Sequence, residues 1–482
     1  MPDSNEPLLV LAVPAWEELR QAYQSWDVAE VEARLKERLD KLPNPPSLPG
    51  RSNLATEFKV VALPSNAPIP TGLDIPPAQF HQFLVCGIVM TGGPEAARAL
   101  AANVRLAFGD EASVGADLAV SAAQSVDQFW SHWCPEEADY GLVGDRATAL
   151  RTIRAEPASL AAVGLPGPER VNVVFVDTGL PLNLLPATGF RGWPVLEDPM
   201  HPTGPVRHPG NPLTPHGEMV ARNARAVVRV PAPPNPDLQL LDCPVIPDGI
   251  TDLRVFLRSV TAALYSVAAV ILWKRAQEPE PASPRTGWVI CNAWGVFDPT
   301  LEFSEVPYSN NPEHPVAFAL RLLELLCADI VFAAGNCGQF CPNPRCHPEF
   351  TGPGRSINGA NSLDEVLTVG AVRTDRLWLG YSGQGPGIAG MAYEKPDLCA
   401  PSQFANEDDA GPNTGTSAAC GLTAGAIALL RTRWRCSMVG PAALRDILRD
   451  SAVQPDGPPG WRDRTGHGIL DLAAAAGRLN EG

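Results

Sequence analysis

The stretch VNVVFVDTGLP, residues Val171 to Pro181, decides the fold of this chain. It opens with a nearly unbroken apolar run, which is typical of a strand in a parallel sheet that is covered on both faces. Asp177 follows directly, with Thr178 and Gly179 behind it. A buried carboxylate needs a partner, and active sites form at the carboxyl edge of open α/β sheets. The aspartate therefore predicts a polar partner close by.

Apolar runs and helical patterns alternate from this strand to the end of the chain. The predicted strands are VNVVFVD, LQLLDCPV, WVICNAWG, DIVFAAGN and VLTVGAV; the predicted helices are residues 253–275, VAFALRLLELLCA and the small-residue run after NTGTS. Such alternation predicts an α/β fold, in which helices cover both faces of a parallel sheet. We assign residues 165–482 to this domain.

The first 164 residues have a different pattern. Residues 1–50 hold one amphipathic helical segment, WDVAEVEARLKERLDKL, before the breaker run PNPPSLPG. Residues 51–164 predict an α+β region, with strands FKVVALP and FLVCGIVM, a helix at PEAARALAANVRLAF and a further helical pattern around SAAQSVDQFW. The N-terminal part is therefore expected to consist of two units, a helical segment at residues 1–50 and an α+β region at residues 51–164.

Composition excludes several classes of protein. The chain has 482 residues, 45% of them hydrophobic and 19% charged, which is typical of a globular protein. A net charge of −16 argues against nucleic-acid binding. The start of the chain lacks a basic segment and its apolar run is interrupted by Pro14, so no export signal is expected. Residues 253–275 contain Arg258, which favours a buried helix over a membrane span. We therefore expect a cytoplasmic protein whose 11 cysteines are mostly free thiols.

Three polar residues stand out against this background: Asp177, His216 in PHGEMVARNA, and Ser417 in NTGTSAACGL. Each alone suits a turn, a loop or a helix cap. Together they form a set in which an imidazole takes the proton of a serine hydroxyl and a carboxylate orients the imidazole. Ser417 begins a predicted helix, whose N–H groups suit a developing oxyanion, and Asn336 in VFAAGNCG offers a side-chain amide for the same purpose.

The order of these segments resembles the subtilisin-like serine proteases. The matching pieces, in order, are VVFVDTG, HGEMVA, VICNAWG, FAAGN, VLTVGAV, YSGQGPG, KPDLCAPS, GTSAA and TGHGILDLAAAA, over about residues 171–476. Two departures occur, since Glu218 and Met219 replace the usual Thr-His after HG, and no Pro-His follows the serine segment. Neither departure removes a residue of the proposed chemistry.

The resemblance implies a role for each matching residue. Asp177, His216 and Ser417 would be the catalytic triad, and Asn336 with the backbone N–H of Ser417 would form the oxyanion hole. An extended substrate would pair with Asn292, Ala293, Trp294 and Gly295, with Trp294 as an aromatic wall. The side chain before the cleaved bond would enter a pocket lined by Ala333, Ala334 and Gly335. The chemistry needs no cofactor, although the family resemblance makes calcium possible.

A second cluster lies directly after Asn336, in CGQFCPNPRCH. Its candidate metal ligands are Cys337, Cys341, Cys346 and His347. Their spacing is not that of a standard zinc finger, and structural zinc, disulfides and free thiols all remain open.

We therefore predict a serine endopeptidase that acts on protein or peptide substrates. The alternatives are an inactive subtilisin-like binding module, and a ligase or esterase that uses the same acyl-enzyme. The N-terminal region, residues 1–164, is expected either to recognise a partner protein or substrate, or to serve as a prosegment that blocks the site until it is cut off.

Overall fold

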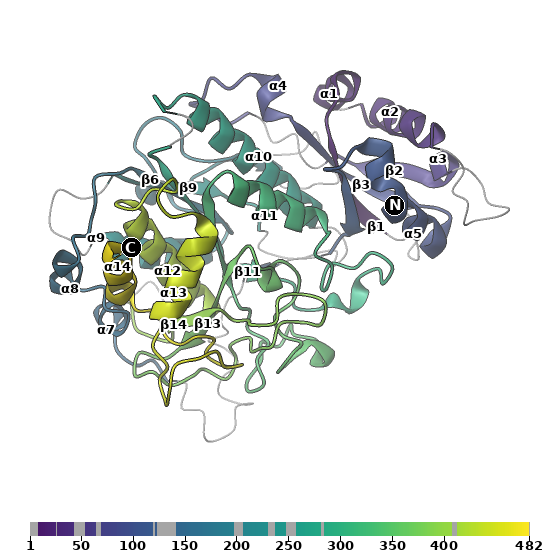
Figure 1. Ribbon diagram of the computed structural model, residues 1–482. Helices are drawn as coiled ribbons and strands as arrows, with labels where there is room; N and C mark the ends of the chain where they lie inside the picture. The colour runs from purple at the N-terminus through teal and green to yellow at the C-terminus, as the bar shows by residue number, and fades with distance from the viewer. Residues whose placement is uncertain are drawn as a thin grey trace.

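The computed structural model describes most of the chain and gives its architecture in five layers (Figure 1). The described residues are 8–25, 27–42, 54–63, 69–118, 121–122, 141–196, 206–229, 237–246, 257–280, 284–406 and 412–481. The predicted helical pattern around SAAQSVDQFW lies mostly outside these ranges.

The larger of the two main sheets is a six-stranded parallel sheet in the order β14-β13-β12-β10-β6-β9. Its strands are β6 (Val171–Val176), β9 (Leu238–Cys243), β10 (Gly287–Asn292), β12 (Ala328–Ala333), β13 (Leu367–Val372) and β14 (Leu398–Pro401). Most are fully buried because helices cover both faces, as the continuous apolar runs predict. The predicted fold class is therefore confirmed.

Two sets of helices cover the two faces of this sheet. On one face lie α9 (His216–Arg229) and α12 (Gly415–Arg431), with α7 (Arg146–Thr152), α8 (Pro157–Ala162), α13 (Pro441–Ser451) and α14 (Leu472–Glu481) around them. On the other lie α10 (Leu257–Ala276) and α11 (Pro315–Leu325). Helices α7 and α8 pack in the same core as α9 and α12. The part of the chain that packs with the parallel sheet therefore begins at about residue 146, before the predicted boundary at 165. We call the residues from about 146 onward the peptidase-like part.

The N-terminal region forms an antiparallel sheet in the order β2-β3-β1-β4. Its elements are β1 (Leu8–Pro14), α1 (Glu17–Gln24), α2 (Val28–Asp40), α3 (Leu54–Glu57), β2 (Phe58–Ala62), α4 (Pro77–Phe80), β3 (Phe83–Met90), α5 (Gly93–Phe108) and β4 (Ser113–Ala116). The predicted helix at α2 and strands at β2 and β3 are confirmed. Strand β1 was not predicted; it lies between β3 and β4 and joins residues 1–50 to the same unit as the strands that follow.

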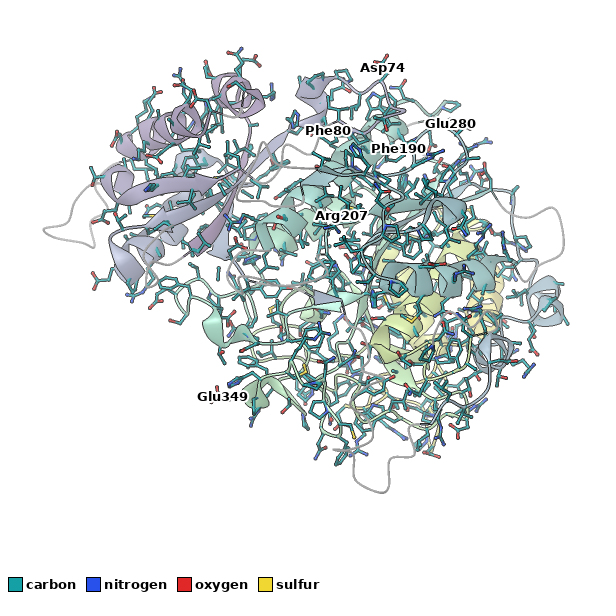
Figure 2. All side chains as sticks on the ribbon, turned by 180° about the vertical axis from the view of Figure 1, so that it is seen from behind. Asp74, Phe80, Phe190, Arg207, Glu280 and Glu349 are labelled. Carbon is teal, nitrogen blue, oxygen red and sulfur yellow. A yellow bond between two sulfur atoms is a disulfide. The ribbon has the colours of Figure 1, made fainter. Side chains whose placement is uncertain are left out.

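Helices α10 and α11 lie between the two sheets, as Figure 1 shows. Alternate residues of β1 face opposite sides, so that Val10 and Ala12 join the core around α10 while Leu9 and Leu11 join the core around α2 and α5. Phe80 and Phe190, labelled in Figure 2, belong to the shared core around α10. The N-terminal sheet is therefore covered on one face by helices of the peptidase-like part.

Helix α10 is the expected buried helix. Within the described residues it is the one helix long and apolar enough to cross a membrane, and 83% of its most apolar window is buried inside the protein. Arg258, in its first turn, is fully buried and lies 2.8 Å from the carboxylate of Asp117, which follows β4 (Nε to Oδ2). A Cβ at Gly87 of β3 would lie 2.0 Å from Nη1 of this guanidinium, so a larger residue there would require the buried arginine to shift.

The cysteines correct one expectation. Disulfides join Cys327 to Cys436 and Cys337 to Cys346, and Cys341 is also disulfide-bonded. The free thiols of the described residues are all buried: Cys86, Cys243, Cys291, Cys399 and Cys420. The prediction of mostly free thiols is therefore wrong for the described cysteines, half of which are bonded. Disulfides persist in oxidising compartments, so the cysteines no longer support a cytoplasmic location.

The remaining short elements connect these layers. They are η1 (Leu182–Leu184), β7 (Val195–Leu196), β8 (Val206–Arg207), β11 (Trp294–Gly295), η2 (Pro299–Leu301), η3 (Pro348–Phe350), η4 (Gly359–Ser362) and β5 (Ser121–Ala122).

Candidate active site

The three predicted catalytic side chains come from three elements that meet at one edge of the parallel sheet. Asp177 follows β6, His216 is the first residue of α9, and Ser417 lies in the first turn of α12. All three are almost completely buried, with exposed fractions of 1%, 4% and 0%. The fold therefore places at this edge the residues that the sequence singled out.

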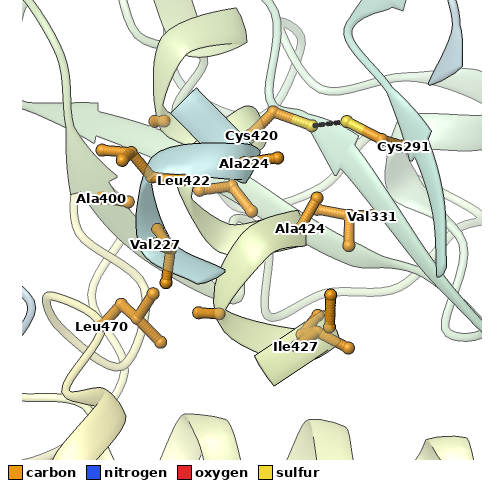
Figure 3. Close-up of a cluster of buried hydrophobic side chains, with 14 of the residues drawn as sticks. Ala224, Val227, Cys291, Val331, Ala400, Cys420, Leu422, Ala424, Ile427 and Leu470 are labelled. Carbon is orange, nitrogen blue, oxygen red and sulfur yellow. Dashed lines mark hydrogen bonds between the residues drawn. The ribbon is translucent and has the colours of Figure 1, made fainter. Parts of the chain in front are cut away.

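Small residues let α9 and α12 pack closely enough to bring their first turns together. A Cβ at Gly421 would lie 2.5 Å from the carbonyl oxygen of Val220, and one at Gly425 would lie 2.4 Å from that of Ala224. Figure 3 shows this interface, where Ala224 and Val227 of α9 face side chains of α12. Any side chain at either glycine would push the two helices apart.

The aspartate and the histidine form a direct pair. His216 Nδ1 lies 2.7 Å from Asp177 Oδ1, and both side chains are shielded from water. The carboxylate also accepts a hydrogen bond from the backbone N–H of Thr178 at 2.7 Å. A Cβ at Gly217 would lie 2.5 Å from the carbonyl oxygen of Gly179, so the glycine after the histidine permits this approach.

This pairing selects one tautomer of the neutral imidazole. In that tautomer Nδ1 donates to the carboxylate and Nε2 carries the lone pair. Nε2 is buried and makes no hydrogen bond to any of the described residues. It is therefore the nitrogen that can accept a proton.

The serine hydroxyl has another partner in this structure. Ser417 Oγ donates to the carbonyl oxygen of Ala293, which follows β10, at 3.4 Å. Catalytic hydrogen bonds are often loose or absent before substrate binds, so this geometry does not exclude the predicted role. Transfer of the proton to His216 requires Ser417 Oγ to come within hydrogen-bond reach of Nε2.

Asn336 is held in one orientation beside the serine. Its Oδ1 accepts hydrogen bonds from the backbone N–H and the hydroxyl of Thr416, at 3.0 and 2.9 Å. The donor end of the amide must then point the other way. Because Thr416 directly precedes Ser417, the asparagine is fixed to the turn that carries the serine.

The loop after Asn336 is a disulfide loop. Cys337 and Cys346 are bonded to each other, and the backbone N–H of Asn343 donates to the carbonyl oxygen of Asn336 at 2.8 Å. His347 Nδ1 accepts a hydrogen bond from the backbone N–H of Glu349 at 3.3 Å. The described residues contain no group of three or more metal-ligating side chains. Of the alternatives for this cluster, the disulfide is the one present, and the bonded sulfurs do not offer zinc a thiolate.

A small pocket lies beside Asn336. It is lined by Gly295, Val296, Phe297, Ala334, Gly335, Cys337, Ser356, Asn358 and Asn361. The predicted pocket residues Ala334 and Gly335 are among them, whereas Ala333 belongs to β12 and presents its carbonyl oxygen to Asn361 at 2.7 Å. Asn361 also donates to the carbonyl oxygen of Trp294 at 3.1 Å and so ties the two walls together. No motif in the sequence predicted this role for Asn361.

The side chains of the predicted substrate strand are not in the pocket. Trp294 is fully buried, and its indole N–H donates to Asn292 Oδ1 at 3.2 Å. The idea of an aromatic wall is therefore wrong, because this ring packs against Phe332 inside the core. The backbone of β11 has a strand partner of its own, since Trp294 and Gly295 pair antiparallel with Ala122 and Ser121 of β5.

A further buried carboxylate lies one strand from the aspartate of the pair. Asp242 of β9 is opposite Phe175 of β6 and is fully buried. Burial raises the pKa of Asp242 to about 7, against the lowering effect of a hydrogen bond from the backbone N–H of Gly210 (3.0 Å to Oδ2). The sequence could have predicted this position, because Asp242 lies near the end of the predicted strand LQLLDCPV and parallel strands end at the same edge of the sheet.

Comparisons with known proteins agree with this architecture. The model of the subtilase family matches residues 272–468. Fervidolysin from Fervidobacterium pennivorans, a keratinolytic enzyme related to subtilisin, has a TM-score of 0.51 at 14% identity, over 99% of this chain and 62% of its own. This chain thus spans less than two thirds of fervidolysin, and at that identity the likeness concerns the fold.

Two other solved structures resemble the chain more loosely. The epidermin leader peptide processing serine protease of Staphylococcus aureus has a TM-score of 0.46 at 17% identity, covering 98% of this chain and 99% of that one. MycP1 from Mycobacterium smegmatis has a TM-score of 0.41 at 18% identity, covering 75% and 91%. None of the curated proteins matches the sequence.

Proposed function

Since residues 272–468 belong to the subtilase family, we propose that this chain is a serine endopeptidase in which Ser417 attacks the peptide carbonyl. His216 takes the hydroxyl proton on Nε2 and later delivers it to the leaving amine. Asp177 holds the imidazole in the required tautomer and stabilises its cation. Water then releases the acyl group from Ser417 by the reverse route.

One observation carries this proposal: the buried pair of Asp177 and His216, 2.7 Å apart, whose imidazole leaves Nε2 without a hydrogen bond among the described residues. A histidine that served only the fold would be expected to satisfy both ring nitrogens when buried. The donor end of Asn336 and the N–H groups of the first turn of α12 supply the charge stabilisation that the tetrahedral intermediate requires.

A covalent probe tests the nucleophile. A fluorophosphonate should label the wild type and should fail to label Ser417→Ala, while Asp177→Asn should slow labelling by about 10⁴-fold through the wrong tautomer. Thr423→Ala, a change of another buried hydroxyl on α12, is the matched control and should keep the label. Equal labelling of the wild type and Ser417→Ala would contradict the assignment, and absence of labelling under all conditions would favour the inactive binding module.

A ligase or an esterase would react with the same probe, so the products must also be examined. Digestion of a proteome-derived peptide library should give new termini with the wild type and none with Ser417→Ala. Joined peptides in place of cleaved ones would instead assign a ligase, because the acceptor of the acyl group would then be an amine.

We further propose that the N-terminal region blocks the substrate edge until it is cut. The support is the pairing of Ser121 and Ala122 with Trp294 and Gly295, the strand that the resemblance assigns to substrate, together with the buried contact of Asp117 and Arg258. A chain that already occupies this edge excludes a second strand from it.

Cleavage of the purified protein tests this blocking role. Incubation of the wild type should produce a new N-terminus after residue 122, with a rise in peptidase activity, and Ser417→Ala should stay intact. Ala122→Pro, which removes a backbone N–H from β5, should raise the initial activity relative to the control Ala122→Gly. Full activity of an uncut wild type would instead support the partner-recognition role.

A further inference from the structure

A groove rich in arginine lies on the outer side of α9, away from the residues of the proposed active site. It has a volume of about 330 Å³, which is at the lower end of the range for small-molecule sites. Its lining consists of Arg146, Ala147, Leu150, Leu184, Arg222, Arg225, Ala226 and Arg229. Four guanidinium groups around one groove are unexpected in a chain with a net charge of −16.

The spacing of the arginines explains how they gather. Arg222, Arg225 and Arg229 are three and four residues apart, so they lie one above another on the same face of α9. The opposite face carries the buried residues that pack on α12 and the sheet, among them Val220 and Ala224. With a rise of about 1.5 Å per residue, the three arginines extend about 10 Å along the helix.

The fourth arginine closes the groove from α7. Arg146 is only 8% exposed, and its guanidinium donates to Asn223 Oδ1 at 3.2 Å and to Asn406 Oδ1 at 2.8 Å. These amide oxygens hold the guanidinium in one orientation. Asn223 is itself fully buried, so the groove has a rigid wall on this side.

Two of the arginines, Arg225 and Arg229, have no ion-pair partner among the described residues. Arg222 is bound to Glu218, at 2.7 and 2.8 Å. Within the parts of the chain that the structure describes, neither Arg225 nor Arg229 forms an ion pair or a side-chain hydrogen bond. Burial lowers the pKa of Arg225, and the charges of Arg229 and Arg222 lower it further. A negative charge placed in the groove would relieve this repulsion.

We infer that this groove is a binding site for a phosphate group, either free or carried on a small organic phosphate. Guanidinium groups present parallel N–H donors that match phosphate oxygens in charge and geometry. Leu150, Leu184 and Ala147 form an apolar wall beside them, against which the body of an ester would pack. The inference does not depend on the proposed peptidase activity.

The position of the groove sets the expected consequence of binding. His216 begins the same helix, and Arg225 lies nine residues further on, about 14 Å along its axis. The ligand would therefore contact α7 and the middle of α9 without contacting the reacting atoms. We expect it to stabilise the packing of these two helices, with little change in the rate of peptide cleavage.

Titration calorimetry with inorganic phosphate, at constant ionic strength, tests the site directly. The wild-type protein should bind one phosphate, and Arg225→Gln/Arg229→Gln should weaken binding by at least about tenfold. The control Arg285→Gln/Arg376→Gln changes the net charge equally at two exposed positions and should bind like the wild type. Arg225→Lys/Arg229→Lys keeps the charge but loses the paired donors, so its loss should be intermediate.

Other outcomes would overturn the inference. They are absence of phosphate binding to the wild type, equal loss in the control variant, or tighter binding of citrate than of phosphate. A second arm with phosphoserine separates the two sources, since equal affinity assigns free phosphate and tighter binding assigns an ester that contacts the apolar wall.

One internal competitor must be tested in the same series. Glu407, Asp408 and Asp409 follow Asn406 in the sequence and lie outside the described residues. A variant with these three acids changed to their amides should bind phosphate like the wild type. If only this variant bound phosphate, the groove would belong to the protein's own acidic segment. Hydrogen exchange gives the last check, because phosphate should slow exchange in α7 and around Arg225.

Discussion

The two sheets of this molecule share one layer of helices but depend on it differently. The parallel sheet has helices of its own domain on both faces, and β6 alternates between them, with Phe175 toward α9 and α12 and Val174 toward α10. The antiparallel sheet covers one face with α2 and α5, where Leu11 packs, and turns Val10 toward α10. The N-terminal region thus covers only one face of its own sheet with its own helices. Its removal would expose an apolar face on the antiparallel sheet and another on the peptidase-like part.

The two parts also bury charge differently. In the peptidase-like part, Asp397 accepts hydrogen bonds from Lys395 at 2.7 Å, from Arg449 at 2.8 Å and from the backbone of Thr368. At the seam between the sheets, Asp117 and Arg258 are 2.8 Å apart, yet the Nε, Nη1 and Nη2 atoms of Arg258 make no hydrogen bond to the described residues. The first arrangement is a satisfied network and the second is a poorly aligned pair, so they should respond differently to mutation.

The largest effect is expected at the satisfied network. Asp397→Ala would leave the fully buried ammonium of Lys395 without its carboxylate. We expect the free energy of unfolding to fall by about 3–5 kcal/mol, because an uncompensated charge would remain in the core. Urea denaturation followed by tryptophan fluorescence measures this loss. Asp446→Ala, which removes only the exposed partner of Arg449, is the control, and a similar loss in both variants would contradict the distinction.

The seam should show a smaller effect that a second change reverses. Arg258→Met would leave Asp117 buried without its cation and should loosen the contact between β3 and α10, at a cost of about 3 kcal/mol. The double variant Asp117→Leu/Arg258→Met replaces both charges with apolar groups and should recover most of this loss. Hydrogen exchange of the β1 and β3 amides measures the contact. If the β1 and β3 amides exchanged as fast in the double variant as in Arg258→Met, the interaction between Asp117 and Arg258 would itself stabilise this contact.

The contributions of Asp117 and Asp397 to the free energy of unfolding should depend on pH in opposite directions. Burial raises the pKa of Asp117 to about 6 despite the charge of Arg258. Between pH 4 and 6 the folded protein therefore holds a proton that the unfolded chain has released, so this contribution to stability falls as the pH rises, by up to about 1.4 kcal/mol per unit. Burial also acts to raise the pKa of Asp397, but Lys395 and Arg449 outweigh it and leave that pKa lowered. Its contribution is present above pH 4 and is lost in more acidic solution.

Denaturation between pH 3 and 7 separates these contributions. The difference in stability between the wild type and Asp117→Asn should shrink as the pH rises toward 6 and stay constant above it. A difference that stayed constant over that interval would show that Asp117 is ionised in the folded protein as in the unfolded chain, held by Arg258 in a true ion pair.

Most of the peptidase-like part could be predicted from sequence because its signals are local. Unbroken apolar runs indicate the strands, and Asp177, His216 and Ser417 occur in motifs of a few residues each. Strand β1 was missed although LLVLAVP is an apolar run, because that run was considered only as an export signal interrupted by Pro14. Its partners β3 and β4 lie 69 or more residues away in the chain. The disulfide of Cys327 and Cys436 joins residues 109 positions apart.

Residues whose role depends on spatial neighbours were missed for the same reason. Asn361 joins the two walls of the pocket through hydrogen bonds to Trp294 and Ala333, neither of which is near it in sequence. One partner of Ser417 in this structure is the carbonyl of Ala293, which no side-chain pattern reveals. A side chain's identity indicates what it can bind, while the fold alone decides what it meets.

The smallest effect is expected at the exposed part of the seam. Arg98 of α5 lies 3.4 Å from Glu305 across the same boundary that Asp117 and Arg258 occupy, but 59% of the arginine side chain is exposed. Water screens such a pair and both side chains lose freedom when they meet, so its net contribution is small. Glu305→Gln should leave the unfolding midpoint and the exchange of the β1 amides unchanged at moderate salt. If Glu305→Gln sped up exchange of the β1 amides as much as Arg258→Met, the exposed ion pair would contribute as much to this contact as the buried pair. That result would contradict the expected difference between buried and exposed charges.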